Sequence, residues 1–455
     1  MIRAMGVIVL GLVSMPALGA DVFSAATLKT MPDQDTPAVR SRAVRVNFDT
    51  GGGLPSNPGD ELTLNLFDDL TVRGVVTSSR ESSGFIVVHG HVPGEAEGEF
   101  LLVYGQGVMT GEVRGAGIGS YEVRFASEGV HVVREIDDHG WKPCATDHAH
   151  EVDGGGVTGP GGYDDRTPII RVLVMYTAQA MNAEGSEAAM QSRVVFAINQ
   201  ANTVYVNSQV NAQLELAYMG LVDYVESGNA STDLSRWRST SDGFMDVVHC
   251  MRNQVGADMC ALLVNNFNAC GIAYLMTNVG PGFATSAFSV TDKDCINGYT
   301  FAHELGHNMG CAHDRANAGS AAYPYAYGYR TPDSVYRTVM AYSPGTRVGR
   351  FSNPNISYNG YVMGVPIGQT DAAFNAQCIT NTAPTIAAFR GAPMNSADVN
   401  CDGALNGVDV EIQELAVGGL MADYCNADAD FNQDGAVNGL DVEAVELAVG
   451  GGWGC

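Results

Sequence analysis

The stretch Phe301-Ala302-His303-Glu304-Leu305-Gly306-His307-Asn308-Met309-Gly310-Cys311-Ala312-His313-Asp314 decides the chemistry of this chain. His303 and His307 are four residues apart, so on a helix their imidazoles lie on one face and can bind a single ion. Gly310 permits a sharp turn after the helix, which brings His313 round as a third ligand. Three protein ligands leave one position of a zinc ion open, as in catalytic sites.

Glu304 lies beside these histidines and is placed to handle a proton, not to ligate the metal. We expect it to take a proton from the attacking water and to deliver it to the leaving amine. The motif therefore predicts one catalytic Zn2+ and a metalloendopeptidase that acts on a protein or peptide. Two other interpretations stay open: a non-catalytic surface or scaffold protein with a structural zinc site and a calcium-dependent tail, and an amidase acting on non-peptide bonds.

The spacing His303-Glu304-x-x-His307-x-x-Gly310-x-x-His313 is the metzincin signature, and Asp314 after it resembles the reprolysin, or adamalysin-like, branch. The resemblance covers roughly residues 167–391. It implies that Met340 is the methionine of a turn beneath the zinc. Tyr342 departs from the reprolysin pattern and resembles the zinc-side tyrosine of astacin-like and serralysin-like enzymes. It could contact the metal, steady an oxyanion or simply pack in the turn.

Outward from the motif, the 455 residues divide into several parts, and we expect a multidomain protein. A short apolar run, Val7–Val13, followed by small residues is typical of a signal peptide, so the protein is expected to be secreted or attached to the cell surface. Alternating apolar residues before the linker indicate a β-rich, antiparallel domain. Its position before the catalytic region is that of a prosegment, although it could instead stay attached as a β domain. The expected parts are a signal peptide (1–20), the prosegment (21–150), a Gly-rich linker (151–167), a metzincin catalytic domain (168–391) and a dockerin-like repeat (395–455).

The catalytic region alternates strands and helices, which predicts an α/β domain with a mixed twisted sheet. The Gly271–Tyr274 stretch resembles the metzincin edge strand, along which an extended peptide can pair. The expected strands are Ile169–Tyr176, Leu214–Val222, Cys260–Val264 and Ile272–Met276, and the expected helices are 185–206 and Trp237–Val255.

The net charge of −26, from 24 Lys+Arg against 50 Asp+Glu, argues against a nucleic-acid partner, because such proteins need a basic face. No stretch of about 18 apolar residues follows the N-terminal run, so no membrane span is expected in the mature chain.

Cys144 stands apart from the other cysteines, in Lys142–His148 near the end of the expected prosegment. Its thiolate could occupy the open zinc position, as in the cysteine switch of related metzincins, because zinc accepts soft sulfur ligands. His148 or His150 could serve instead, and Cys144 could equally be buried or paired.

Six further cysteines fall in the catalytic region, and sequence does not fix their connectivity. Cys250 and Cys260 could pair with each other. Cys311 is expected to form a disulfide, and Cys378 resembles the cysteine that anchors the last helix in reprolysins.

The C-terminal region contains two near-identical acidic segments 32 residues apart, a spacing that indicates a duplicated unit. Each has oxygen ligands at EF-hand offsets, with one helix after the loop, and so predicts a small α-helical, EF-hand-like tail with two Ca2+. It resembles a type I dockerin, which implies a cohesin-like partner, although Gly407-Val408 and Gly439-Leu440 replace the usual recognition pair. A calcium-stabilised tail without a partner is the alternative. The expected ligands are Asp398, Asn400, Asp402, Ala404, Asn406, Asp409, Asp430, Asn432, Asp434, Ala436, Asn438 and Asp441.

Overall fold

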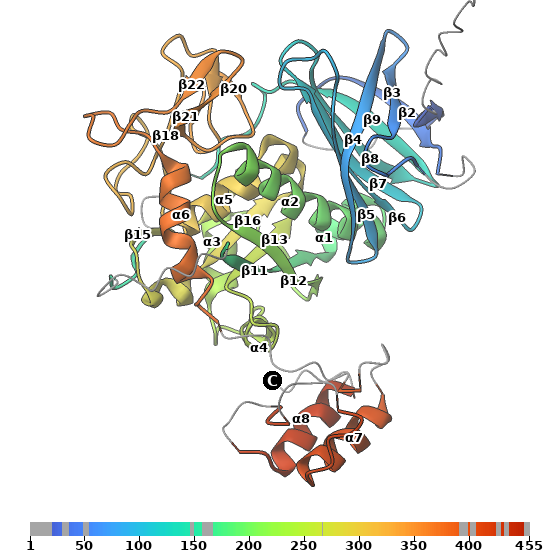
Figure 1. The fold of residues 1–455 in the computed structure, drawn as a ribbon, viewed down its shortest axis with the longest axis vertical. Helices are drawn as coiled ribbons and strands as arrows, with labels where there is room; N and C mark the ends of the chain where they lie inside the picture. The colour runs from blue at the N-terminus through green and yellow to red at the C-terminus, as the bar shows by residue number, and fades with distance from the viewer. Residues whose placement is uncertain are drawn as a thin grey trace, which may run out of the picture.

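The computed structural model describes residues 21–29, 36–48, 54–145, 150–156, 167–265, 267–390, 399–400, 406–424, 429–431 and 436–449. Figure 1 shows a β domain, an α/β domain beside it and a pair of tail helices. The expected signal peptide and most of the expected linker lie outside the described residues. Among the described helices, none has the length and apolar character needed to cross a membrane.

The N-terminal domain is a nine-stranded antiparallel sheet in the order β1-β2-β9-β8-β7-β6-β5-β4-β3. The side chain of Asn65 hydrogen bonds to both the N–H and the carbonyl of Phe23, at 3.0 and 2.6 Å. These bonds join the first strand to the last, so the sheet is nearly closed. The strands are β1 (Phe23–Ala25), β2 (Ala38–Val46), β3 (Glu61–Phe67), β4 (Leu70–Ser82), β5 (Phe85–His91), β6 (Glu99–Gly105), β7 (Val108–Gly115), β8 (Gly119–Ser127) and β9 (Val130–Ile136).

Both faces of this sheet are buried at its centre. In β6, Phe100 and Leu102 pack in the interior of the β domain, whereas Leu101 and Val103 belong to the core of the catalytic domain. The long helix α2 (Glu187–Asn207) of the catalytic domain lies against β6 and β7. A strand covered on both faces needs a continuous apolar run, and 100–104 reads Phe-Leu-Leu-Val-Tyr.

The catalytic domain has a five-stranded mixed sheet in the order β12-β11-β13-β16-β14. Its first four strands are mutually parallel, and β14 is an antiparallel edge. The helix α5 (Thr300–Asn308) packs against β14 and β16, at the end where the histidine motif lies. The strands are β11 (Ile169–Thr177), β12 (Gln213–Val222), β13 (Met259–Val264), β14 (Gly271–Ala273) and β16 (Phe288–Asp292).

Two expected elements of this domain are wrong in extent. The single helix expected over Trp237–Val255 is two helices, α3 (Ala230–Arg238) and α4 (Val247–Gln254), because Gly243 and Met245 between them adopt positive φ angles of 82° and 54°. The strand expected over Ile272–Met276 is divided into β14 and β15 (Leu275–Asn278).

The remaining elements are short, apart from the last helix of the catalytic domain and the tail helices. The tail helices pack on each other around Ala416, Tyr424, Phe431 and Val445. These elements are α1 (Ala178–Glu184), β10 (Glu151–Asp153), η2 (Pro281–Ser286), η3 (Lys293–Gly298), β17 (Ala312–Asp314), β18 (Tyr327–Gly328), β19 (Tyr336–Arg337), β20 (Thr346–Arg347), β21 (Asn353–Tyr358), β22 (Tyr361–Met363), α6 (Asn375–Ile386), α7 (Gly407–Val417) and α8 (Gly439–Val449).

Candidate metal centre and active site

The motif forms a helix, a turn and a short strand, all buried. His303, Glu304 and His307 lie on α5, and His313 follows on β17. The turn between them is made at Gly310, whose φ is +86°. A Cβ on this residue would lie 2.5 Å from the Cβ of Ala322, so both conformation and space require glycine.

The structure brings the three imidazoles to one point. The Nε2 atoms of His303, His307 and His313 are 3.0–3.2 Å apart. Two nitrogens that share one tetrahedral zinc ion lie about 3.3 Å apart, given Zn–N bonds of about 2.0–2.1 Å. The donor set and its spacing therefore fit one zinc ion.

The other ring nitrogens are held by backbone carbonyls. His303 donates its Nδ1–H to Val339 O and His307 donates its own to Cys311 O, both at 2.8 Å. Because a carbonyl only accepts, these bonds leave the Nε2 lone pairs facing the centre. Burial and the neighbouring imidazoles lower the pKa of His303, and burial lowers the pKa of His307 to about 4. The rings are therefore neutral, which is the form that binds metals.

Two residues of the turn after the motif pack against the histidines. Met340 is fully buried, and a Cβ on Gly306 would lie 2.8 Å from its sulfur, so the methionine lies directly beneath α5. The Tyr342 ring packs on His313, with centroids 4.2 Å apart, and its hydroxyl donates to Cys144 O at 3.3 Å. In this structure the tyrosine hydroxyl thus engages the N-terminal segment.

Glu304 is buried beside the histidines, and among the described residues neither carboxylate oxygen makes a geometric hydrogen bond. Burial raises the pKa of Glu304 to about 8. Its side chain packs on the edge strand, where a Cβ at Gly271 would overlap Oε1. Gly271 therefore makes room for the carboxylate.

Cys144 enters this site from the N-terminal side. Its sulfur, a ring nitrogen of His303 and a carboxylate oxygen of Glu304 all lie within 4.8 Å of one another. The backbone is fixed by bonds from Cys270 N to Pro143 O and from Ala145 N to Gly271 O, at 3.0 and 2.9 Å. Burial and the nearby Glu304 carboxylate raise the pKa of the Cys144 thiol.

After Cys144 the chain continues along the edge formed by β14 and β15. Residues 146–149, which include His148, lie outside the described residues, and β10 pairs in parallel with β15. The first residues of the expected linker are therefore a strand. Between them and the histidines remains a cavity of about 40 Å³, lined by Ala145, His150 and Glu304 among others.

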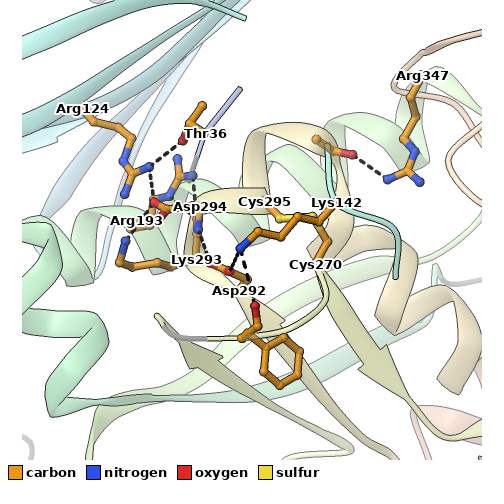
Figure 2. The surroundings of a disulfide bond; sticks show 12 residues. Thr36, Arg124, Lys142, Arg193, Cys270, Asp292, Lys293, Asp294, Cys295 and Arg347 are labelled. Carbon is orange, nitrogen blue, oxygen red and sulfur yellow. Dashed lines mark hydrogen bonds and ion pairs between the residues drawn. A yellow bond between two sulfur atoms is a disulfide. The ribbon is translucent and has the colours of Figure 1, made fainter. Parts of the chain in front are cut away.

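Buried charges attach the β domain to the catalytic domain. Arg124 is 1% exposed and forms ion pairs with Glu184 and with Asp294, the latter at 2.6 Å. Figure 2 shows this arginine reaching across to Asp294, and Lys142 reaching toward Asp292, beside the disulfide. The domains are held together by groups whose separation would leave charges unpaired.

The structure shows which of the six cysteines in the catalytic region are disulfide-bonded and which are free thiols. Cys270 and Cys295 form a disulfide, a pairing that the sequence did not specify. Cys260 is free, so it does not pair with Cys250, which is itself disulfide-bonded. The disulfide expected for Cys311 is wrong, because it is a free buried thiol like Cys378.

Two supporting side chains within the motif were missed. Asn308 donates from Nδ2 to Tyr274 O and Phe288 O at 2.8 and 3.2 Å, tying α5 to the sheet edge. Asp314 pairs with Arg330 at 2.5 Å and accepts from Tyr342 N at 3.0 Å, which positions the Met340 turn. The available signal was that both side chains are polar and lie within or directly after the histidine motif.

In the tail, the structure places some of the expected calcium ligands at helix starts. Asp409 accepts from Asn406 N at 2.8 Å and Asp441 accepts from Asn438 N at 2.8 Å, and both carboxylates are buried. Among described residues, the groups spaced to hold a metal are those around His303 and not these. The expected ligands outside the described residues are Asp398, Asp402, Ala404, Asn432 and Asp434.

Comparisons with known proteins agree with this geometry. The profile of metallo-peptidase family M12 matches residues 166–352. A peptidyl-Asp metalloendopeptidase of Xanthomonas campestris is 39% identical over 304 residues, covering 64% of this chain and 69% of that protein. The chain belongs to metallo-peptidase family M12. It is a zinc metalloendopeptidase, and the reprolysin-like resemblance of its catalytic region is confirmed.

Other M12 relatives match parts of the chain. The Stenotrophomonas maltophilia protein of the same name is 46% identical over 229 residues, covering 49% of this chain and 52% of its own length. The chain thus spans about half of that relative. Among solved structures, metalloproteinase-II from Bacteroides fragilis matches with a TM-score of 0.36 and 12% identity, covering 59% of this chain and 86% of that one.

Proposed function

We propose that this protein is a secreted endopeptidase that cleaves peptide bonds next to aspartate and is kept latent by its own N-terminal region. The observation that carries the proposal is the convergence of three Nε2 atoms within 3.2 Å of one another, beside a buried carboxylate. The preference for aspartate is taken from the M12 relatives, which bear the name peptidyl-Asp metalloendopeptidase.

In this proposal His303, His307 and His313 hold the zinc ion, which when bound polarises the scissile carbonyl and acidifies the attacking water. Glu304 accepts the proton of that water at a carboxylate oxygen and passes it to the leaving nitrogen. Burial raises the pKa of Glu304, and this favours its protonated form between the two steps. Tyr342, once its hydroxyl is released from Cys144 O, supplies a donor for the substrate carbonyl.

Latency is proposed to come from Cys144 and the chain on either side of it. The thiol lies beside His303 and Glu304, so it can compete with an attacking water for the open zinc position. The segments 143–145 and Glu151–Asp153 cover the β14 and β15 edge along which a substrate would pair. A substrate therefore reaches the zinc site only after this segment leaves.

The tail is proposed to bind two calcium ions and to act as a dockerin-like attachment unit for a cohesin-like partner. Support comes from the duplicated acidic segments and from the buried carboxylates Asp409 and Asp441 at equivalent helix starts. Secretion is proposed from the apolar N-terminal run Val7–Val13.

The test is peptide-library cleavage combined with metal analysis of the same sample. We expect one zinc per chain, low activity before the linker is cut, and cleavage next to aspartate afterwards. Glu304→Ala should retain zinc and release no peptides. Equal activity in that variant would exclude the mechanism, and cleavage without regard to aspartate would exclude the specificity.

A further inference from the structure

Two buried arginines flank the Met340 turn. The strands β19 and β20 pair in parallel with Arg337 directly opposite Arg347. The two residues are only 4% and 7% exposed, and among described residues neither forms an ion pair. Two like charges held opposite each other and away from water are unfavourable, so the pair is expected to serve an anion.

The two guanidinium groups differ in the number of hydrogen bonds that they donate. Arg337 donates from Nε to Gly345 O and from Nη1 to Ala341 O, both at 2.7 Å, and so holds the loop that contains Met340. Arg347 makes one bond, from Nη1 to Gly298 O at 3.0 Å, which Figure 2 shows, and its buried Nε has no partner among described residues. Arg347 therefore retains donors for a ligand.

Arg347 lies next to the path of the chain through the active site. Its acceptor Gly298 immediately precedes Tyr299 and α5, and a Cβ on Gly298 would lie 2.9 Å from the ring of Trp141. Trp141 is three residues before Cys144, which lies beside Glu304. Arg347 is therefore linked to the active site through Gly298, Trp141 and the segment that carries Cys144.

The uncleaved chain already presents carboxylates to this surface. A cavity of about 230 Å³ has Arg347 and Arg350 on the catalytic side, with Glu97, Glu99 and Asp138 on the side of the β domain. Glu97 pairs with Arg350 at 2.6 Å. These acidic groups belong to the N-terminal region, so its removal would leave Arg347 and Arg350 without the carboxylates that now share their cavity.

We infer that Arg347 binds the side-chain carboxylate of the substrate aspartate, with Arg337 adding positive charge behind it. This inference rests on the proposed function and names the residue that sets its specificity. Other arginines near the site are already engaged. Arg330 is paired with Asp314 at 2.5 Å, and Arg315 donates to Ala372 O at 2.8 Å.

The test uses the full chain after its linker has been cut, and peptides identical except for aspartate or asparagine at one position. Arg347→Gln should lower the Asp-to-Asn ratio of kcat/KM by at least about 30-fold, because one partner of a buried charge contact is removed. The kcat/KM for the asparagine peptide should fall by a much smaller factor, since an amide side chain offers Arg347 no charge to pair with.

Two control arginines are available. Arg252 is a buried guanidinium that, like Arg347, donates only to backbone carbonyls, such as Ala284 O at 2.7 Å. Arg238 packs over Tyr274 near the edge strand, 4.8 Å from the ring centroid. Arg252→Gln and Arg238→Gln should leave the ratio unchanged. Arg347→Lys keeps the charge but loses the planar fork, and should lower the ratio by at least about fivefold.

The outcomes separate the inference from the proposed function. A wild-type enzyme without preference for aspartate would overturn both. A wild-type preference that persists within about threefold in Arg347→Gln would overturn the inference alone. If Arg238→Gln loses the preference for aspartate while Arg347→Gln keeps it, the inference alone is also overturned. If Arg347→Gln does not fold, the Arg347→Lys ratio decides by the same criterion.

Discussion

The active site and the segment that covers it are built in opposite ways. The zinc-binding histidines and Glu304 come from eleven consecutive residues, His303 to His313, whose spacing alone brings them together. The cover is made of distant parts: Arg124 of β8 reaches Asp294, and Cys144 reaches Glu304. Local geometry therefore determines the catalytic chemistry, whereas the latency that we propose depends on the folding of two domains against each other.

The first prediction concerns the locally built zinc site. Gly271→Ala places a methyl group on Glu304 Oε1, and we expect kcat/KM to fall at least about 100-fold, because the general base is displaced. Zinc content should be unchanged. Gly407→Ala is the matched control, since a Cβ there meets nothing within 4 Å. Activity within about threefold of wild type in Gly271→Ala would contradict the placement of Glu304.

The second prediction concerns the cover. Cys144→Ala removes the thiol beside His303, so the uncleaved chain should gain activity toward short peptides, by about tenfold or more. It should stay below the cleaved enzyme, because segments 143–145 and Glu151–Asp153 still line the cleft. Cys260→Ala, another free buried thiol, should change nothing. Unaltered latency in Cys144→Ala would show that the thiol does not block the site.

The third prediction weakens the contact between domains. Arg124→Leu leaves two buried carboxylates, Glu184 and Asp294, with Lys293 still paired to both, and removing one partner of a buried ion pair costs about 3–5 kcal/mol. After the linker is cut, the β domain should dissociate faster on size-exclusion chromatography. Arg134→Leu is the control, because its pair with Glu122 at 3.0 Å lies within the β domain. Equal dissociation in the two variants would mean that the Arg124 contacts do not hold the cover.

The smallest effect is a pH dependence. Burial raises the pKa of Asp292 from its ordinary 3.8 to about 7. A carboxyl whose pKa is raised on folding lowers stability as pH rises from about 4 to about 7, because the folded state retains a proton that the unfolded state has released. Asp292→Asn should therefore increase Tm relative to wild type more at pH 8 than at pH 5. A difference in Tm that does not change with pH would contradict this.

The metal site could be predicted from the sequence because its ligands lie close together in the chain. His303, His307, Gly310 and His313 have the spacing of one helical turn plus one sharp turn, and the fold keeps it. The helix break between α3 and α4 was not predicted, because positive φ angles at Gly243 and Met245 interrupt an otherwise amphipathic pattern. The Cys270–Cys295 disulfide was not predicted either, because it is set by tertiary packing. The role of Arg347 could not be predicted either, because it depends on the pairing of β19 with β20.

X-ray absorption spectroscopy of the zinc-loaded, uncleaved chain shows which atoms bind the metal before and after the N-terminal region is removed. We predict three nitrogen neighbours and one sulfur neighbour around zinc, with the sulfur replaced by oxygen once the N-terminal region is removed. A zinc ion with fewer than three histidine nitrogens, or with the same neighbours before and after removal, would contradict this prediction.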